Sequence, residues 1–327
     1  MNPAGILRRA RAITHDRLGL ITRARRRLDG SRVAILYYHR VIPEEQAQRD
    51  HVEPGMYVTP ESFSEQLDWL GQYFRVLPLH EVVQTLAEGR DLPERACSIT
   101  FDDGWLDNFE HALPELARRG LPATFFVVTQ RVGSDGAFWP DDVCRRLVPL
   151  SEPDQRQLAR QLGAPVGPLA LDSLLDFLKQ QTQDDLEATL VKLRSQTETP
   201  ASRGRELMTW EELGRLSSAG NDVESHCESH AILTRLTEEQ AHAELGDSLA
   251  ELRARGHARH GLLAYPSGGY DGGVIEAARE VGYRAAVTTE NGLASQASNA
   301  LALPRLCVHQ GIAGSREEFL FKIPGRA

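Results

Sequence analysis

The chain has 327 residues, of which 41% are apolar and 25% are charged, as in folded globular proteins and unlike disordered or fibrous ones. Its 37 basic and 46 acidic residues give a net charge of −9, which argues against a dedicated nucleic-acid-binding protein. No stretch approaches the roughly 18 consecutive apolar residues that a membrane-spanning helix needs, and no cleavable signal peptide is visible. We therefore expect a globular cytoplasmic protein.

The charge is unevenly distributed. Residues 1–32 contain nine arginines and two aspartates, a net charge of +7, so residues 33–327 carry −16. Ile6, Ile13 and Leu20 are seven residues apart, and this spacing predicts one basic helix over residues 1–30. Such a helix suits peripheral contact with an anionic membrane at its inner face, and the alternative is a solvated appendage. We expect residues 31–327 to form the main folded domain.

Strand and helix patterns alternate after this leader. A run of β-branched and aromatic residues over 33–38 predicts a buried strand that ends at His39. Thr59 followed by Pro60 is typical of a helix start. The remaining elements expected in this part are a surface loop over 43–58, a strand over 96–101, a helix over 105–119 and a strand over 123–128.

The alternation stops between about residues 135 and 205. Leucines at helical spacing, without strand patterns, predict a helical insertion there. From Thr209 onward the alternation resumes, with strands expected over 222–225, 262–265, 285–288 and 305–308. Alternating strands and helices predict an α/β fold with a parallel sheet. The four cysteines, Cys97, Cys144, Cys227 and Cys307, are far apart and indicate free thiols.

Two adjacent carboxylates follow the strand expected over 96–101. The segment TFDDG at residues 100–104 places Asp102 and Asp103 at the carboxyl end of a buried strand, where parallel α/β folds build their sites. Adjacent carboxylates repel each other, so a cation or a shared proton would stabilise both. Taken alone, the segment is equally compatible with a polar turn.

Two histidines four residues apart follow the strand expected over 222–225. His226 and His230 would face the same side of a helix, a spacing found in zinc sites, although an isolated pair of this kind is more often a surface feature. One carboxylate and two imidazoles together are the ligand set of a catalytic divalent metal with open positions. Occurrence of both segments at strand ends therefore favours a metal site.

A third segment, YPSGGY at residues 265–270, is a proline and glycine turn after the strand expected over 262–265. TFDDG, the SHxxSH segment and this turn, in that order, resemble the NodB-type polysaccharide deacetylases, carbohydrate esterase family four. The resemblance covers about residues 33–310, apart from the insertion. The opening LYYHRV at residues 36–41 is similar to the bacterial exopolysaccharide branch, which includes the poly-N-acetylglucosamine deacetylases.

The resemblance implies a distorted (β/α) barrel and a set of roles. By resemblance, Asp102 is the general base, Asp103, His226 and His230 hold a divalent metal, and a metal-bound water is the nucleophile. Zinc is the metal that this ligand set favours, although cobalt, nickel, manganese and iron stay open. Four further residues are expected at the substrate: Tyr265, Pro266, Ser267 and Trp105.

Two positions depart from the family pattern. Ala264 stands where the family motif carries an arginine that orients the base, so that role is vacant or belongs to another group. The general acid is a second question, because the late motif of the family offers only His309 here. In the YHxV branch the early histidine takes this role, so we favour His39 and keep His309 as the alternative.

These inferences lead to one expected activity: removal of N-acetyl groups from an amino-sugar polysaccharide or glycan intermediate. Hydrolysis of another C–N bond or of an O-acetyl ester at the same site is the alternative among enzymes. A catalytically retired carbohydrate-binding protein is the alternative outside enzymes, but the ligands and the base that such a protein would lose are all present.

Overall fold

The structure is a computed structural model that describes residues 7, 10–14, 28–53, 55–135, 138–165, 167–200 and 204–323. Within the basic leader, residues 10–14 are helical, and most of the helix expected over residues 1–30 lies outside the described residues. None of the described helices is both long enough and apolar enough to span a bilayer.

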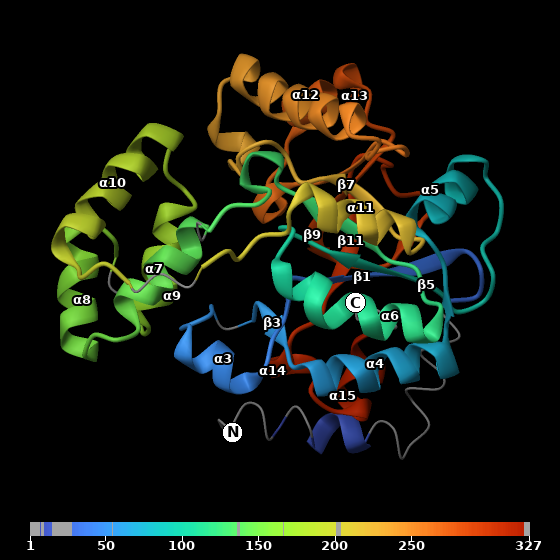
Figure 1. Cartoon of the computed structure of the whole chain (residues 1–327), viewed down its shortest axis with the longest axis horizontal. Helices are drawn as coiled ribbons and strands as arrows, with labels where there is room; N and C mark the ends of the chain where they lie inside the picture. Colours follow the sequence, from blue (N-terminus) through green and yellow to red (C-terminus); the bar gives the residue numbers. More distant parts are fainter. Residues whose placement is uncertain are drawn as a thin grey trace.

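Seven parallel strands close into a barrel, which confirms the predicted (β/α) barrel (Figure 1). β1 pairs with both β5 and β11, and these two pairings close the ring. The barrel strands, in their order around the ring, are β1 (Arg32–Tyr38), β11 (Leu303–Cys307), β9 (Ala285–Asn291), β8 (Leu262–Ala264), β7 (Asp222–Ser225), β6 (Thr124–Val127) and β5 (Ala96–Phe101). Because all seven run in the same direction, their carboxyl ends meet at one end of the barrel.

Four short strands lie outside the ring. β4 (Arg75–Val76) pairs with β5, and β10 (Ala294–Ser295) pairs antiparallel with β1. β2 (Arg40–Val41) and β3 (Tyr57–Val58) form a separate pair beside the carboxyl end of β1. Two-residue strands carry too little pattern to be recognised in a sequence, so all four were absent from the prediction.

The barrel strands are buried on both faces. Alternate residues of β1 belong to different hydrophobic clusters: Val33 and Ile35 pack with residues of the other barrel strands, and Ala34 and Leu36 pack with the surrounding helices. Successive side chains of a strand point to opposite faces, so the first cluster fills the barrel and the second lies between barrel and helices. This double burial explains the nearly continuous apolar runs.

Helices surround the barrel, and many begin at a side-chain cap. Thr59 caps α4 and accepts from the N–H of Ser62, as its sequence predicts. Thr209 and Thr237 each form a capping box, at α11 and α12. The helices around the barrel are α3 (Glu44–Arg49), α4 (Pro60–Tyr73), α5 (Leu79–Ala87), α6 (Leu113–Arg119), α11 (Trp210–Ser218), α12 (Glu238–Ala254), α13 (Gly272–Val281), α14 (Gln310–Ala313) and α15 (Arg316–Lys322).

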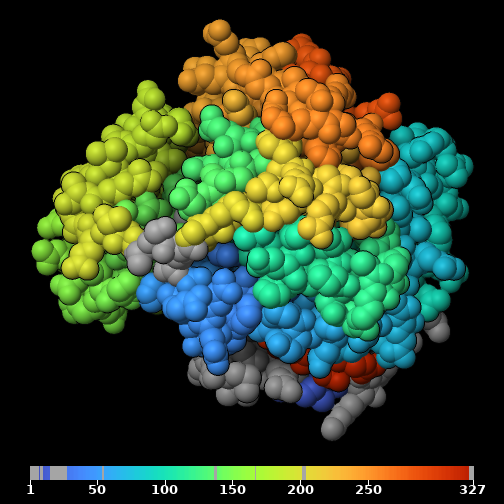
Figure 2. Space-filling model, in the orientation of Figure 1, coloured from blue at the N-terminus to red at the C-terminus, as the bar shows by residue number. Residues whose placement is uncertain are grey.

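Four helices occupy the stretch in which an insertion is expected. They pack around their own leucine-rich cluster and form a lobe at one side of the molecule (Figures 1 and 2). A buried bidentate pair between Arg145 and Glu206, at 2.8 and 2.6 Å, ties this lobe to the chain that returns to the barrel. The four helices are α7 (Trp139–Leu147), α8 (Glu152–Gln161), α9 (Ala170–Leu178) and α10 (Gln183–Gln196).

Two predicted elements differ from the structure. The loop expected over residues 43–58 contains α3 and β3, because Ala47 packs with Ile42 and Val52 in a small cluster of its own. The helix expected over residues 105–119 begins as a π-helical turn over Asn108–Ala112 and continues as α6. Pro114 has no N–H to bond the carbonyl four residues earlier, which accounts for the wider turn before it.

Candidate active site

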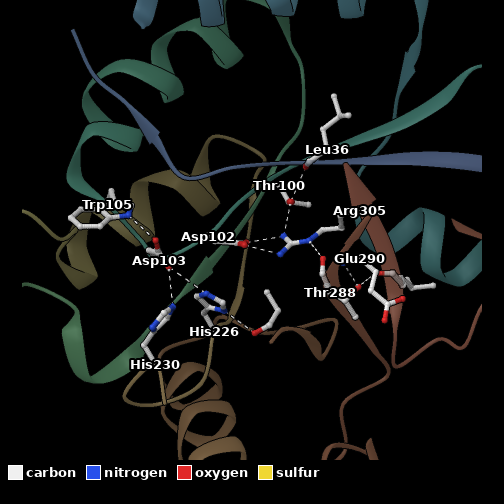
Figure 3. Close-up of polar contacts among 12 residues, drawn as sticks. Leu36, Thr100, Asp102, Asp103, Trp105, His226, His230, Thr288, Glu290 and Arg305 are labelled. Atoms are coloured by element: carbon white, nitrogen blue, oxygen red, sulfur yellow. Dashed lines mark hydrogen bonds and ion pairs between the residues drawn. The ribbon is translucent and has the colours of Figure 1, made fainter. Parts of the chain in front are cut away.

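The motifs lie at the carboxyl end of the barrel, and Figure 3 shows the carboxylates of the first beside the histidines of the second. Asp102 and Asp103 follow β5, His226 follows β7, and the turn that begins at Tyr265 follows β8. Seven non-glycine residues in the described part of the chain have positive φ, and four of them are in these motifs: Asp103, Cys227, His230 and Ser267. Such backbone conformations cost energy and are retained where a site requires them.

Asp103, His226 and His230 converge on one point. The Nε2 atoms of the two histidines lie 3.3 and 3.5 Å from Oδ1 of Asp103. Ligands held at about 2.1 Å in tetrahedral geometry are about 3.4 Å apart, so this spacing fits a divalent ion such as Zn²⁺. His226 is almost fully buried, and His230 is partly buried beneath the ring of Phe138.

Hydrogen bonding around these three side chains favours a cation between them. Nδ1 of His226 lies 2.7 Å from the carbonyl oxygen of Ala264, which can only accept, so Nδ1 carries the proton. The lone pair of Nε2 in the neutral ring then faces the carboxylate, and two electron-rich atoms face each other stably only with a cation or a proton between them. Burial opposes charge at both residues, yet hydrogen bonding to Asp103 raises the pKa of His226, and the two histidines hold the pKa of Asp103 well below its usual value.

Asp102 forms a buried bidentate ion pair with Arg305. Nη1 and Nη2 of the arginine lie 2.8 and 2.7 Å from Oδ1 and Oδ2 of the aspartate. Arg305 comes from β11 and is completely buried. Burial by itself raises the pKa of Asp102, but the guanidinium overcomes this effect and holds the pKa below its ordinary value. Asp102 is therefore ionised and fixed in orientation.

Arg305 resolves the departure noted at Ala264. Ala264 ends β8 with its side chain buried, and the arginine that orients Asp102 arrives instead from the last barrel strand. Its Nε donates to the carbonyl of Thr288 and its Nη1 also donates to Thr100, so the guanidinium cannot turn away. The sequence held a signal for this residue: a charged side chain within an otherwise apolar strand indicates a buried partner.

Trp105 is buried and forms a hydrogen bond with Asp103. The sequence placed it at the substrate, but its indole is only 1% exposed, and Nε1 donates to Oδ2 of Asp103 at 2.9 Å. The guanidinium of Arg40 lies 4.1 Å from the centre of its ring and pairs with Asp107 behind it. This stack fixes the carboxylate of Asp103 so that Oδ1 faces the histidines.

The two candidate acids lie in different surroundings. His39 is partly buried beside the site; burial lowers its pKa, and the charges of Asp103 and Asp102 partly oppose that effect. His309 precedes α14, and its ring lies against Gly55 and Gly311. Asp102 and Asp103, the expected base and metal ligand, are the carboxylates that act on His39. His39 is therefore the better candidate for the general acid.

The turn after β8 presents backbone more than side chains. Tyr265 is buried, and its hydroxyl donates to the carbonyl of Leu301, so its ring belongs to the core rather than to a sugar site. Pro266 is also buried, whereas Ser267 is exposed. Gly268 has φ +70°, and a side chain there would collide with Thr289. Of the four residues expected at the substrate, only Ser267 is exposed.

The segment that carries both histidines is a loop and not the helix that their spacing suggested. Positive φ at Cys227 and His230 turns the chain so that both rings reach Asp103. Glu244 of α12 holds this loop, because its carboxylate accepts from the N–H groups of Glu228 and Ser229 at 3.1 and 2.9 Å and from the hydroxyl of Ser229. Motif analysis missed Glu244 because it lies on a helix, away from every motif.

Comparison with known proteins gives consistent matches. The family model described as "Polysaccharide deacetylase" matches residues 89–286. A Bacillus subtilis (strain 168) protein, YxkH, whose name marks its polysaccharide deacetylase activity as unproven, is 24% identical over 259 residues, which are 79% of this chain and 68% of that protein.

Two further matches concern a shorter segment and the fold. The poly-beta-1,6-N-acetyl-D-glucosamine N-deacetylase of Staphylococcus epidermidis is 33% identical over 78 residues, 24% of this chain and 27% of that protein. The structure of the Streptococcus pyogenes deacetylase PplD in complex with acetate has the same fold, with a TM-score of 0.61 and 20% identity over 89% of this chain and 98% of that one.

Proposed function

Because the chain belongs to the polysaccharide deacetylase family, we propose that it is a metal-dependent hydrolase that removes N-acetyl groups from an amino-sugar polysaccharide or glycan intermediate. One observation carries the proposal: an ionised, arginine-held carboxylate, Asp102, lies next to a carboxylate and two imidazoles that converge at the same barrel end. A base beside a cation site is the combination that amide hydrolysis needs.

Asp102 accepts the proton of the attacking water. Each of its oxygens receives one N–H of Arg305 and keeps a further lone pair for that proton. The ion pair makes Asp102 a well-oriented but weak base, because its pKa lies below the ordinary value. A weak base can deprotonate water only when the acidity of that water is increased.

Asp103, His226 and His230 would hold the divalent ion, for which we propose zinc. When bound, such an ion supplies the missing acidity by lowering the pKa of a water molecule, and it polarises the acetamide carbonyl. Trp105 and the carbonyl of Ala264 fix Asp103 and His226 before any ligand arrives.

His39 and the turn after β8 complete the reaction. The oxygen of the water forms a bond to the acetamide carbon as Asp102 takes the proton. The C–N bond then breaks as protonated His39 gives its proton to the departing amine, and acetate and a free amino sugar remain. The proton on Asp102 returns to solvent, from which His39 is protonated again. A backbone N–H of the turn at Pro266 and Ser267 stabilises the oxyanion. Of these two residues only Ser267 has an N–H group. His309 is the alternative acid.

The proposed substrate class is based on the family and on one relative. Poly-beta-1,6-N-acetyl-D-glucosamine is named as the substrate of the Staphylococcus epidermidis protein, and the shared segment supports a β-1,6-linked acetylated glucosamine polymer as the first compound to test.

The test measures acetate release from β-1,6-linked and β-1,4-linked N-acetylglucosamine oligomers by the wild-type chain. We expect release to stop after dialysis against a chelator and to return when Zn²⁺ is added back. Activity that is unaffected by chelation would contradict metal dependence. Release from acetyl esters alone would favour the esterase alternative, and metal binding without any hydrolysis would favour a binding protein.

Replacement of Glu244 separates loop positioning from chemistry. Glu244→Ala removes all three hydrogen bonds to the loop of His226 and His230, so we expect the affinity for Zn²⁺ to fall by about 10- to 100-fold. Glu244→Gln keeps one acceptor oxygen for the two N–H groups and should lose much less. Titration of the wild type and both variants with Zn²⁺ against a competing chelator checks this. An affinity of Glu244→Ala equal to that of the wild type would contradict the role of Glu244 in positioning the histidine loop.

Three expectations stay predictions. These are the division of the chain at residue 30, the cytoplasmic location and the contact of residues 1–30 with an anionic membrane.

A further inference from the structure

A second group of metal-ligating side chains lies at the other end of the barrel. His80 is on α5, Asp222 is the first residue of β7, and His260 is in the turn that leads into β8. The proposed catalytic residues follow the carboxyl ends of the strands, whereas this group lies where β7 and β8 begin. Four residues of strand, about 13 Å, separate Asp222 from His226, so the two groups share no side chain.

The three side chains meet although they are far apart in the sequence. Nδ1 of His80 lies 2.7 Å from Oδ2 of Asp222, and Nε2 of His260 lies 3.3 Å from Oδ1. One ligand atom of each residue lies within 4.8 Å of the others. The two imidazole rings are stacked, with centroids 3.8 Å apart and planes inclined by 5°.

The backbone that carries this group is fixed from behind. Glu224 is 1% exposed, and its carboxylate accepts from the N–H groups of His260 and Leu262 at 3.1 and 2.8 Å. This arrangement holds the turn of His260 against the start of β8. A hollow lined by Asp222, His257 and His260, among others, adjoins the group and leaves space for water ligands.

The donor set determines which ligand fits. Two imidazole nitrogens and one carboxylate oxygen suit Zn²⁺ and related divalent transition metals, and do not suit Mg²⁺ or Ca²⁺, which prefer oxygen ligands. A single ion bound by both nitrogens requires the rings to turn out of their stack. The side chains of His80 and His260 are 27% and 31% exposed, which gives them room to do so.

We propose that His80, Asp222 and His260 bind a second divalent metal ion, of the zinc class, that links α5 to the start of strands β7 and β8. The ion would stabilise the folded chain because the unfolded chain does not hold these residues together. This proposal does not rest on the deacetylase activity, since none of its ligands lies in the proposed catalytic site.

The test counts metal ions in the chain prepared without a polyhistidine tag. After chelation, the protein is loaded with Zn²⁺ alone, dialysed and measured by elemental analysis. We expect about two ions per chain in the wild type, about one in His226→Ala, about one in His80→Ala or His260→Ala, and none in His226→Ala/His80→Ala. Acetate release by His80→Ala should equal that of the wild type.

His242→Ala is the matched control, because His242 is a half-exposed histidine 3.9 Å from Glu280 that belongs to neither group. It should keep both ions. In a His226→Ala background, Zn²⁺ should raise the melting temperature, and this rise should vanish when His80→Ala is added. A zinc content of His80→Ala and His260→Ala equal to that of the wild type would overturn the proposal. This holds also if the two variants are less stable than the wild type.

Discussion

Replacement of Asp102 by asparagine is expected to lower kcat for acetate release by about 10²- to 10⁴-fold, the range that a positioned general base contributes. The amide has the size of the carboxylate but cannot take the proton of water. Metal content should remain, because Asp103, His226 and His230 are unchanged. Measurement of kcat and zinc content on the same preparation checks both statements.

Stability must be separated from chemistry in this variant. Asp102→Asn leaves Arg305 charged, buried and without its counter-ion, which costs about 3–5 kcal/mol. Asp142→Asn is the matched control, because it also breaks a largely buried arginine–aspartate pair, that of Arg146, within the insertion lobe. We expect a similar loss of stability from this control and a far smaller loss of activity. If Asp102→Asn kept kcat within about tenfold of the wild type, another group would be the base.

The second large effect is expected for Arg305→Gln. Without the guanidinium, the largest effect that opposes burial is lost, so the pKa of Asp102 rises. The base is then protonated at higher pH than before, and the acidic limb of the kcat/KM profile moves toward higher pH. Loss of the bidentate hold also misplaces the carboxylate, which lowers kcat by about 10²-fold. A pH profile of kcat/KM measures the shift, and a simple loss of stability would not produce it.

The double variant Asp102→Asn/Arg305→Gln completes this experiment. Since the two residues form one unit, its activity should resemble that of Asp102→Asn rather than the product of both losses. Its stability should exceed that of either single variant, because no buried charge is left without its partner. Additive losses of activity, with an unchanged pH profile in Arg305→Gln, would contradict the positioning role of Arg305.

The parts of this molecule that were predictable from sequence depend on local patterns. Strand β7 was expected at residues 222–225 and is found there, and the Asp102–Asp103 pair and His226 are placed by the strands directly before them. A residue at the end of a parallel strand has a known location in the fold once the alternation of strands and helices is recognised. The core of the site was therefore readable.

The other parts depend on contacts between distant segments. Arg305 reaches Asp102 across 203 residues, and no spacing rule connects the two. His80 and His260 belong to no sequence motif, because the barrel, and not the sequence, brings them to Asp222. Trp105 was expected at the substrate but is buried. Its burial depends on Arg40 and on the chain that returns from the insertion at Leu207, and neither contact can be recognised in the sequence.

The origin of Arg305 in the last barrel strand has a consequence for biosynthesis. On the ribosome, Asp102 emerges about 200 residues before its partner. Until β11 enters between β1 and β9, the ring is open and the carboxylate of Asp102 has no guanidinium to hold it. A nascent or truncated chain that ends before β11 thus lacks the ion pair that orients Asp102, even though TFDDG and both histidines are already present. We expect such a chain to lack the hydrolytic activity that is proposed for Asp102.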